Sequence, residues 1–322
     1  MSTAGRSNIG VASAGSTSSG AAPGPAPKEL FARLIDDAAI FPPGNATLAA
    51  AVSQHRRLRA GHLGQYVGPL LCAASRLAEL GLVLDDEAME DGAELPGLDI
   101  AVVVDTATSS VAELAGAVQA DDRLDLQGVE VALRGDTDLG STARRTVAAL
   151  IAAELPDSCA IYVEVPLVRT SFDALDVLSE YDLRAKLRTG GADAAAFPDE
   201  AAVAAFLNAC LDRELALKCT AGLHHAVRHT DPTTGFEHHG FLNVLLATHT
   251  LIAGATVQDA VAVLAERDGE VLADTARALS AAEAARARRS FASYGSCSVT
   301  EPIDDLASLA LLPPAPVCPA SR

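Results

Sequence analysis

Aromatic residues are scarce in this chain of 322 residues: tryptophan is absent, and Phe, Trp and Tyr together make up 4%. Apolar residues still account for 49% of the sequence, a share that is typical of globular proteins. The core is therefore expected to consist of aliphatic side chains, mainly Ala, Leu and Val.

Basic residues are also few, with 24 Lys and Arg against 42 Asp and Glu and a formal net charge of −18. A negative field of this size repels nucleic acids and anionic membrane surfaces, so neither is expected as a partner. An anionic substrate would have to be bound by a local cluster of positive groups.

Paired CxxC cysteines, a secretory signal and long apolar runs are all lacking. The six cysteines are scattered, which favours reduced thiols over a disulfide framework. No stretch approaches the roughly 18 consecutive apolar residues of a membrane span, and the N-terminus has no apolar core of a signal peptide. The sequence predicts a cytoplasmic protein.

Three parts of the chain differ in composition. Residues 1–27 are rich in Gly, Ala, Ser and Pro and are expected to form a disordered tail, and residues 313–322 are expected to form a flexible C-terminal tail. Residues 28–312 are predicted to form a single domain.

Seven short apolar runs, mostly about 25–35 residues apart, alternate with segments of helical periodicity. The runs are 66–74, 98–105, 126–134, 159–167, 183–191, 215–222 and 290–298. Apolar strands that alternate with amphipathic helices indicate a parallel sheet covered on both faces. With an eighth strand, the pattern predicts a (β/α)₈ barrel of the TIM type.

The eighth strand is expected within 240–251, although that run fits a buried helix equally well. Two helices, around 28–39 and 45–59, are predicted to precede the barrel. The alternative fold is an open, doubly wound sheet, but no Gly-x-Gly-x-x-Gly motif follows the first predicted strand.

Polar residues stand near the carboxyl ends of several predicted strands, where parallel α/β proteins bind ligands. They are Asp105, Glu130, Arg134, Glu164, Lys186, Arg188, Lys218 and Thr220. The two lysines lie 32 residues apart, one strand–helix unit, so they are expected to be neighbours on adjacent strands. A second cation would lower the pKa of a buried lysine and favour Schiff-base chemistry.

A structural interpretation of the same residues is an ion pair between Lys186 and Glu164 inside the barrel. The catalytic interpretation assigns Lys186 or Lys218 as the amine and Glu164 as its partner. In that interpretation an anion is held by side chains and backbone groups at the strand ends. These groups are Arg188, Thr189, Gly190, Gly191 and Thr220.

The last predicted strand ends in Gly295, Ser296, Cys297 and Ser298, ahead of a helix that starts near Glu301. Barrels often bind phosphate at such a loop, so Gly295, Ser296 and Ser298 are further candidates for anion binding. Cys297 is either a nucleophile or a small buried side chain. Asp36 and Asp37 either fold over the mouth of the barrel or cap its far end, and the sequence leaves both places open.

Five of the eight histidines lie between His224 and His239. His224 and His225 are candidates for acid–base catalysis in a loop without metal. As an alternative, His225, His229, His238 and His239 could bind a divalent metal ion. The Glu of an H-E-x-x-H motif is absent, and no cofactor is predicted as the leading interpretation. A purely structural loop is the third possibility.

Several segments between residues 30 and 312 together resemble a family of uncharacterised bacterial proteins. The segments are DDAAIFPPGNATLAAAV, KLRTGGADAAAFP, KCTAGLHHAVRH, HGFLNVLLA and YGSCSVTEPIDDL. This resemblance implies no activity. A second likeness is to deoxyribose-phosphate aldolase, in which Glu164, Lys186 and Lys218 would take the places of an acidic residue and two strand lysines. Arg188 and the pair His224 and His225 depart from that family's pattern.

The leading functional hypothesis is a β/α-barrel enzyme, of the lyase or aldolase type, that acts on a small anionic carbonyl compound. The alternatives are a metal-dependent hydrolase or lyase that uses the histidines, and a non-catalytic barrel that binds a metabolite or a partner protein. The oligomeric state is not predicted.

Overall fold

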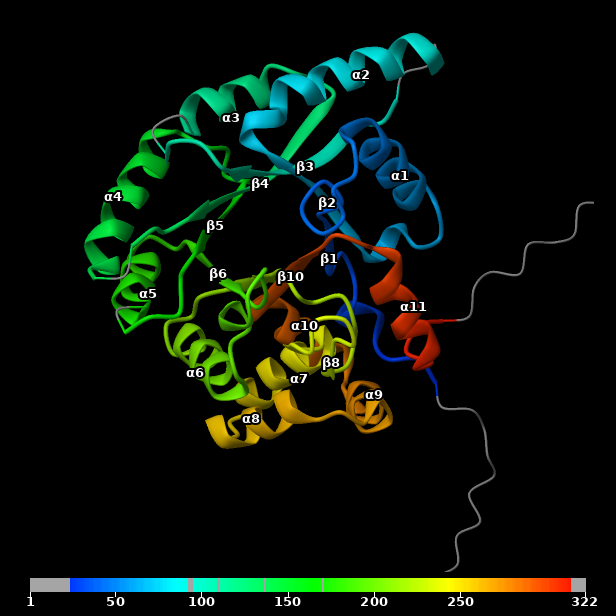
Figure 1. Ribbon diagram of the computed structural model, residues 1–322, viewed down its shortest axis with the longest axis vertical. Coiled ribbons are helices and arrows are strands. Elements are labelled where there is room, and N and C mark those ends of the chain that lie inside the picture. Colours follow the sequence, from blue (N-terminus) through cyan, green and yellow to red (C-terminus); the bar gives the residue numbers. More distant parts are fainter. Residues whose placement is uncertain (1–23, 92–94, 109–110, 136, 170, 314–322) are drawn as a thin grey trace, which may run out of the picture.

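Eight parallel strands close into a barrel in the order β1-β10-β7-β6-β5-β4-β3-β2, with helices around the outside (Figure 1). The strands are β1 Ile35–Asp37, β2 Val67–Ala73, β3 Leu98–Val104, β4 Leu124–Ala132, β5 Ala160–Glu164, β6 Arg184–Arg188, β7 Leu217–Thr220 and β10 Phe291–Ser296. The fold is a (β/α)₈ barrel, as the spacing of the apolar runs predicts. The alternative of an open sheet is wrong.

The computed structural model describes residues 24–91, 95–108, 111–135, 137–169 and 171–313. Most of the two predicted tails, 1–27 and 313–322, therefore lies outside the described residues. Within the described part, Ala26 is buried, and its amide donates a hydrogen bond to the carbonyl of Leu311. The segments that precede and follow the barrel thus meet at this point.

The helices that follow the first six strands are α1 Leu48–Ala60, α2 Leu77–Asp91, α3 Val111–Gln119, α4 Leu139–Ala152, α5 Ser171–Glu180 and α6 Glu200–Leu211. Strand β7 is followed by the hairpin β8 His229–Thr230 and β9 Glu237–His238, and then by α7 Phe241–Ile252, α8 Val257–Ala265, α9 Gly269–Ala278 and α10 Ala281–Ser290. Helix α11, Thr300–Ser308, comes after β10. The predicted helix around 45–59 is confirmed as α1.

The prediction for the first and the eighth strand is corrected by the structure. Residues 28–39 are not a helix: they form a short 3₁₀ turn, Lys28–Leu30, and strand β1. The run 240–251 is the buried helix α7 rather than a strand, so the remaining barrel strand lies at the N-terminal side. Strand β1 closes the barrel because it pairs with β10 on one side and with β2 on the other.

Local sequence explains where the covering helices begin. Asp199 precedes α6, and its carboxylate accepts a hydrogen bond of 2.8 Å from the amide of Ala202, which satisfies a free N–H of the first turn. Val203, Phe206 and Leu207 of this helix are buried. Their spacing of three and four residues places them on one face, against the barrel.

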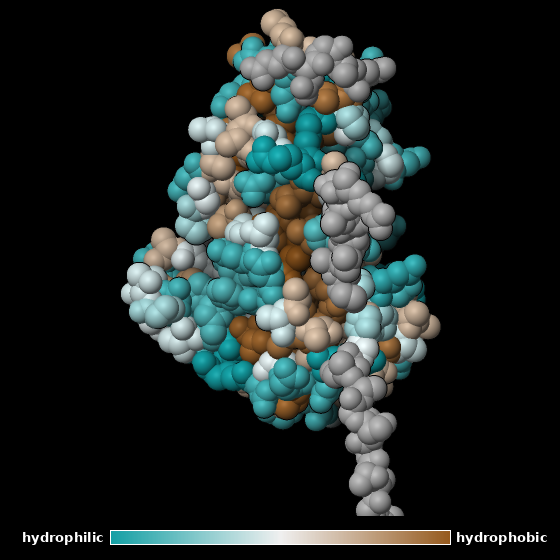
Figure 2. Space-filling model, turned by 90° about the vertical axis from the view of Figure 1, so that its right-hand side faces the viewer, coloured by the Kyte–Doolittle hydropathy of each residue, from teal (hydrophilic) through white to brown (hydrophobic). Residues whose placement is uncertain are grey.

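One described segment, Ala194–Leu211, has the length and composition of a membrane span, with 18 residues and a mean hydropathy of 1.2. It includes α6, whose apolar side chains pack into the barrel protein. A third of the segment, 33%, is buried, including Val203, Phe206 and Leu207 of α6. The face that lies on the right in Figure 1 is mostly hydrophilic, with a narrow hydrophobic strip (Figure 2).

The barrel interior is divided into a small apolar part and a charged part. Ala38, Leu71 and Ala101 form an apolar cluster separate from the main core, which lies between strands and helices. The charged part includes Asp36, for which Gly68 leaves room: a Cβ at Gly68 would come within 2.1 Å of an Asp36 carboxylate oxygen.

Candidate active site

Two lysines project into the barrel from adjacent strands. Lys186 of β6 and Lys218 of β7 are paired in register, as their spacing along the chain predicts. The chain has three lysines in all, and the third, Lys28, is exposed. Because an unpaired ammonium group is costly to bury, both barrel lysines need carboxylate partners on other strands.

Glu130 of β4 lies between the two lysines. Its Oε1 is 2.5 Å from Nζ of Lys218, and its Oε2 is 2.7 Å from Nζ of Lys186. Burial alone would raise the pKa of Glu130, but the two ammonium groups lower that pKa to about 2. Glu130 is therefore a carboxylate at neutral pH, and it holds the two amines at a fixed spacing.

Asp36 of β1 forms the inner end of this arrangement. Its Oδ2 accepts hydrogen bonds from the ammonium group of Lys218 and from the hydroxyl of Ser293, the latter at 2.7 Å. Nζ of Lys218 also lies 5.1 Å from the centre of the Tyr162 ring, a distance at which the ring stabilises the charge. The buried ammonium group of Lys218 is therefore surrounded by two carboxylates and an aromatic ring.

The environment of Lys218 overturns one expectation. Burial lowers the pKa of Lys218, but the carboxylates of Asp36 and Glu130 outweigh burial and raise that pKa above its ordinary value. The predicted effect, a pKa lowered by the second lysine, is wrong for this residue because two carboxylates stand closer to Lys218 than the prediction assumed. Lys218 is a charged group at neutral pH and a poor nucleophile.

Glu164 and Arg188 form the outer end. Oε2 of Glu164 is 3.0 Å from Nζ of Lys186, and Nε of Arg188 is 2.7 Å from Oε1 of Glu164. Both cations lower the pKa of Glu164 although burial raises it. The exposed fraction of the side chains rises from 2% for Lys218 and 6% for Lys186 to 50% for Arg188. A continuous row of ion pairs therefore leads from the barrel centre to solvent.

The loops after β6 and β7 are packed tightly against each other. The hydroxyl of Thr189 donates a hydrogen bond of 2.6 Å to the carbonyl of Ala221. A Cβ at Gly190 would come within 2.9 Å of Gly222, which itself has a φ of +77°, and a Cβ at Gly191 would come within 2.6 Å of Ala196. Close packing thus accounts for Thr189, Gly190 and Gly191 without a ligand.

The loop after β10 uses its hydroxyl groups internally. Ser296 is buried and donates a hydrogen bond of 2.6 Å to the carbonyl of Ser298, and the hydroxyl of Ser298 accepts one of 3.4 Å from the amide of Glu301. Gly295 pairs with Thr220 across the strands, at the same end of the barrel as Arg188. These candidates for anion binding therefore lie at the expected end, and their hydroxyls fix the start of α11.

Three of the four histidines proposed as metal ligands form a row: the ring centre of His225 lies 4.7 Å from that of His229, which lies 5.2 Å from that of His238. His225 contacts Asp305, with Nδ1 3.1 Å from Oδ2. His229 and His238 face each other across the β8–β9 hairpin, and His238 lies against the ring of Phe197. His239 is buried, and its Nε2 lies 2.8 Å from the carbonyl of Pro198. Within the described ranges, no three His, Cys, Asp or Glu side chains are arranged to hold a metal ion.

Four residues of the charged interior have no catalytic role in the interpretation of the sequence, although Glu130 stands among the polar residues at the predicted strand ends. The four are Asp36, Glu130, Tyr162 and Ser293. The sequence marks two of them as unusual: Glu130 is a charged residue within an apolar strand, and Asp36 is followed directly by a second aspartate. For Tyr162 and Ser293 only the register of the closed barrel shows that they point inward.

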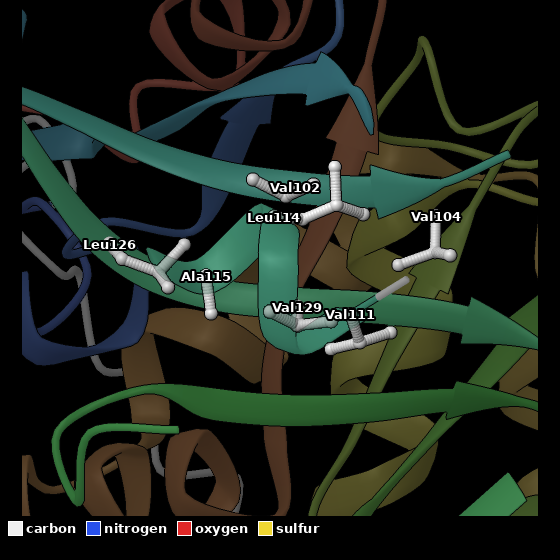
Figure 3. Close-up of a pocket in the computed structure, with 7 residues that line it drawn as sticks. All are labelled: Val102, Val104, Val111, Leu114, Ala115, Leu126 and Val129. Carbon is white, nitrogen blue, oxygen red and sulfur yellow. The ribbon is translucent and has the colours of Figure 1, made fainter. Parts of the chain in front are cut away.

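A second feature is a small cavity between α3 and the strands β3 and β4 (Figure 3). Its lining is entirely apolar and consists of Val102, Val104, Val111, Leu114, Ala115, Leu126 and Val129. A cavity without polar groups offers nothing to orient a substrate and stays dry. The charged row inside the barrel is therefore the candidate active site.

No protein-family model matches the chain, and no curated protein is significantly similar to it. The fold and the site together define the class of protein: a (β/α)₈ barrel with two buried lysines joined by one carboxylate.

Proposed function

We propose that the protein is a lyase- or aldolase-type enzyme in which Lys186 forms a Schiff base with a small anionic carbonyl compound. The observation that carries the proposal is the joint contact of Glu130 with Lys186 and Lys218 in the barrel interior. A buried amine next to a second cation and to a carboxylate is a recurrent arrangement for amine nucleophiles.

Lys186, rather than Lys218, is the nucleophile in this proposal. Lys218 is enclosed by Asp36, Glu130 and the ring of Tyr162, and the raised pKa keeps it protonated. Lys186 lies one strand closer to Glu164 and to solvent, at 6% exposure. Lys218 therefore acts as a fixed positive charge that stabilises negative charge on the reacting carbonyl compound.

Glu164 accepts the proton that Lys186 must lose before its amine attacks the carbonyl carbon. The 3.0 Å distance between Nζ of Lys186 and Oε2 of Glu164 is short enough for direct transfer. The attack forms the C–N bond, and one proton of the attacking nitrogen passes to the carbonyl oxygen. That oxygen leaves as water when Glu164 returns the other proton, and the C–O bond breaks. The iminium ion then withdraws electrons from the neighbouring carbon, which is what cleavage or formation of a C–C bond requires.

Arg188 binds the anionic group of the substrate. Its side chain is half exposed and bound on one side by Glu164, so N–H groups on its other side are free to meet a carboxylate or phosphate. The site holds three cations and three carboxylates, Lys186, Lys218, Arg188, Asp36, Glu130 and Glu164. An anion bound at Arg188 would weaken the hold of Arg188 on Glu164 and leave that carboxylate more basic.

Borohydride trapping tests the proposal, with glycolaldehyde phosphate as the probe. Because the chain has three lysines, peptide mapping by mass spectrometry assigns the reduced adduct to Lys28, Lys186 or Lys218. We expect the adduct on Lys186, its loss in Lys186→Met, and its retention in the control Lys28→Met. An adduct that stays when Lys186 is replaced, or no adduct with any small aldehyde or ketone, would contradict the proposed function.

A further inference from the structure

A second group of reactive side chains lies at the carboxyl end of the barrel. Cys297 follows β10, and its Sγ lies 3.6 Å from Nε2 and 3.7 Å from Nδ1 of His224. Nδ1 of His224 is 3.2 Å from Oε2 of Glu301, in the first turn of α11. The three side chains thus have the order nucleophile, base and orienting carboxylate.

The contact with Glu301 decides which nitrogen of His224 acts as the base. A carboxylate accepts a hydrogen bond from a ring N–H, so Nδ1 carries the hydrogen, and Nε2, 3.6 Å from Sγ of Cys297, is the nitrogen left to take the thiol proton. Burial raises the pKa of the Cys297 thiol, and the negative charges of Glu301 and Asp37 act in the same direction. The resting sulfur is therefore a thiol, which needs the base to react.

Cys297 also differs from the other described cysteines in its access to solvent. Cys72, Cys159, Cys210 and Cys219 are buried, and Cys297 is partly exposed. Buried thiols without a base are inert, whereas Cys297 has both a base and an open side. Gly295 of the same strand pairs with Thr220, the last residue of β7, so Cys297 lies just beyond the carboxyl end of the barrel strands, the end at which Arg188 lies.

We infer that Cys297, His224 and Glu301 form a second covalent site, which binds small aldehydes reversibly as hemithioacetals. The thiol proton moves to Nε2 of His224 while sulfur attacks the carbonyl carbon and forms the C–S bond. The π electron pair moves to the carbonyl oxygen, which takes the proton back from the imidazolium. Thiol and aldehyde add without an oxidant, and the reverse step releases both unchanged. The choice of an aldehyde rests on the proposed function; the reactivity of the thiol does not.

Alkylation by iodoacetamide tests the role of His224, in the full chain with Cys318→Ser because Cys318 lies outside the described residues. We expect Cys297 to be modified before the four buried cysteines. His224→Gln should slow this reaction at neutral pH by about tenfold or more, because a positioned base typically contributes 10²–10⁴-fold. At a pH above the thiol pKa, the two proteins should react at equal rates because no base is then needed.

Two results would overturn the assignment of His224 as the base: equal rates at neutral pH, or a loss that persists at high pH. The melting temperature of His224→Gln shows whether the variant folds, and Glu301→Gln is the second variant, with a smaller expected loss because Glu301 is half exposed.

Glycolaldehyde tests the ligand class in a Lys186→Met background, where no Schiff base can form at that lysine. We expect glycolaldehyde to protect Cys297 from iodoacetamide and to release it again on dialysis. Absence of protection would overturn the aldehyde site. Protection of Cys297 in a protein whose Lys186 is never trapped by borohydride would support this second site while the proposed function fails, so the two outcomes are distinguishable.

Discussion

Glu130 and Lys218 are in direct contact at 2.5 Å in the middle of the barrel, with side-chain exposures of 1% and 2%. Two ions removed from water to this extent stabilise a protein only when each keeps its partner. The contact between Glu130 and Lys218 therefore links the stability of the protein to the arrangement of its candidate active site.

Glu130→Gln should lower the free energy of unfolding by about 3–5 kcal/mol, because it leaves two buried ammonium groups with one carboxylate each. Urea denaturation of the full chain measures the difference. Glu180→Gln is the control: its exposed pair with Arg144 has side-chain exposures of 50% and 57%, so its loss should cost no more than about 1 kcal/mol. Equal effects of the two substitutions would contradict the importance of the buried contact.

Acid should remove the stability that Glu130 provides. The folded pKa of about 2 lies below the ordinary value of 4.5, so the contribution is complete above pH 4.5 and is lost as the pH falls towards 2. One pKa unit corresponds to about 1.36 kcal/mol, so about 2 kcal/mol of the stability that Glu130 contributes is lost between pH 4.5 and pH 3. Denaturation at pH 7, 5, 4 and 3 should show the gap between the natural protein and Glu130→Gln narrowing below pH 4.5. If the difference in unfolding free energy between the two proteins stayed constant down to pH 3, the ionised carboxylate of Glu130 would not be the source of the stability.

Most of the fold could be predicted because apolar runs and helical periodicity report directly on burial. The exception is β1, Ile35–Asp37, which has three residues and two aspartates and so lacks the apolar signature of a buried strand. Adjacent residues of a strand point to opposite faces, and both faces here are polar: Asp36 contacts Lys218 inside, and Asp37 contacts His55 of α1 outside. Pairing with β10 and β2 and these distant side-chain contacts stabilise the strand, and the local sequence reports none of them.

Part of the candidate site could be predicted from the spacing of residues along the chain. The spacing of Lys186 and Lys218 along the chain predicts their proximity, because it equals one strand–helix unit. Glu130 lies 56 residues before Lys186, two strands away in the barrel, and its role depends on the curvature that turns β4 towards β6 and β7. Spacing alone carries no information on that curvature, and it therefore points to Glu164, on the strand next to Lys186, as the partner.

Gly222→Ala should destabilise the protein more than Gly254→Ala. Both glycines have positive φ, +77° and +88°, so both substitutions introduce backbone strain of about 1 kcal/mol. A Cβ at Gly222 would also come within 2.9 Å of the carbonyl oxygen of Thr189, whereas a Cβ at Gly254 meets nothing within 4 Å. The difference in melting temperature between the two variants measures the packing of the two loops. Equal melting temperatures for the two variants would mean that the loops after β6 and β7 move apart at little cost to make room for the Cβ.

Arg188→Gln should weaken the binding of anionic carbonyl compounds and leave that of uncharged ones unchanged. A hydrogen bond to a charged group is worth about 1.5–3 kcal/mol, so the concentration of glycolaldehyde phosphate that gives half-maximal borohydride trapping should rise by about tenfold or more. The value for glycolaldehyde itself should stay the same, because that compound offers no anion to the guanidinium group. Arg145→Gln on α4 is the control, since Arg145 is exposed and donates a hydrogen bond of 3.0 Å to the hydroxyl of Thr142 at the surface. An equal shift for the charged and the uncharged aldehyde would show that Arg188 acts by holding Glu164 in place rather than by binding the substrate.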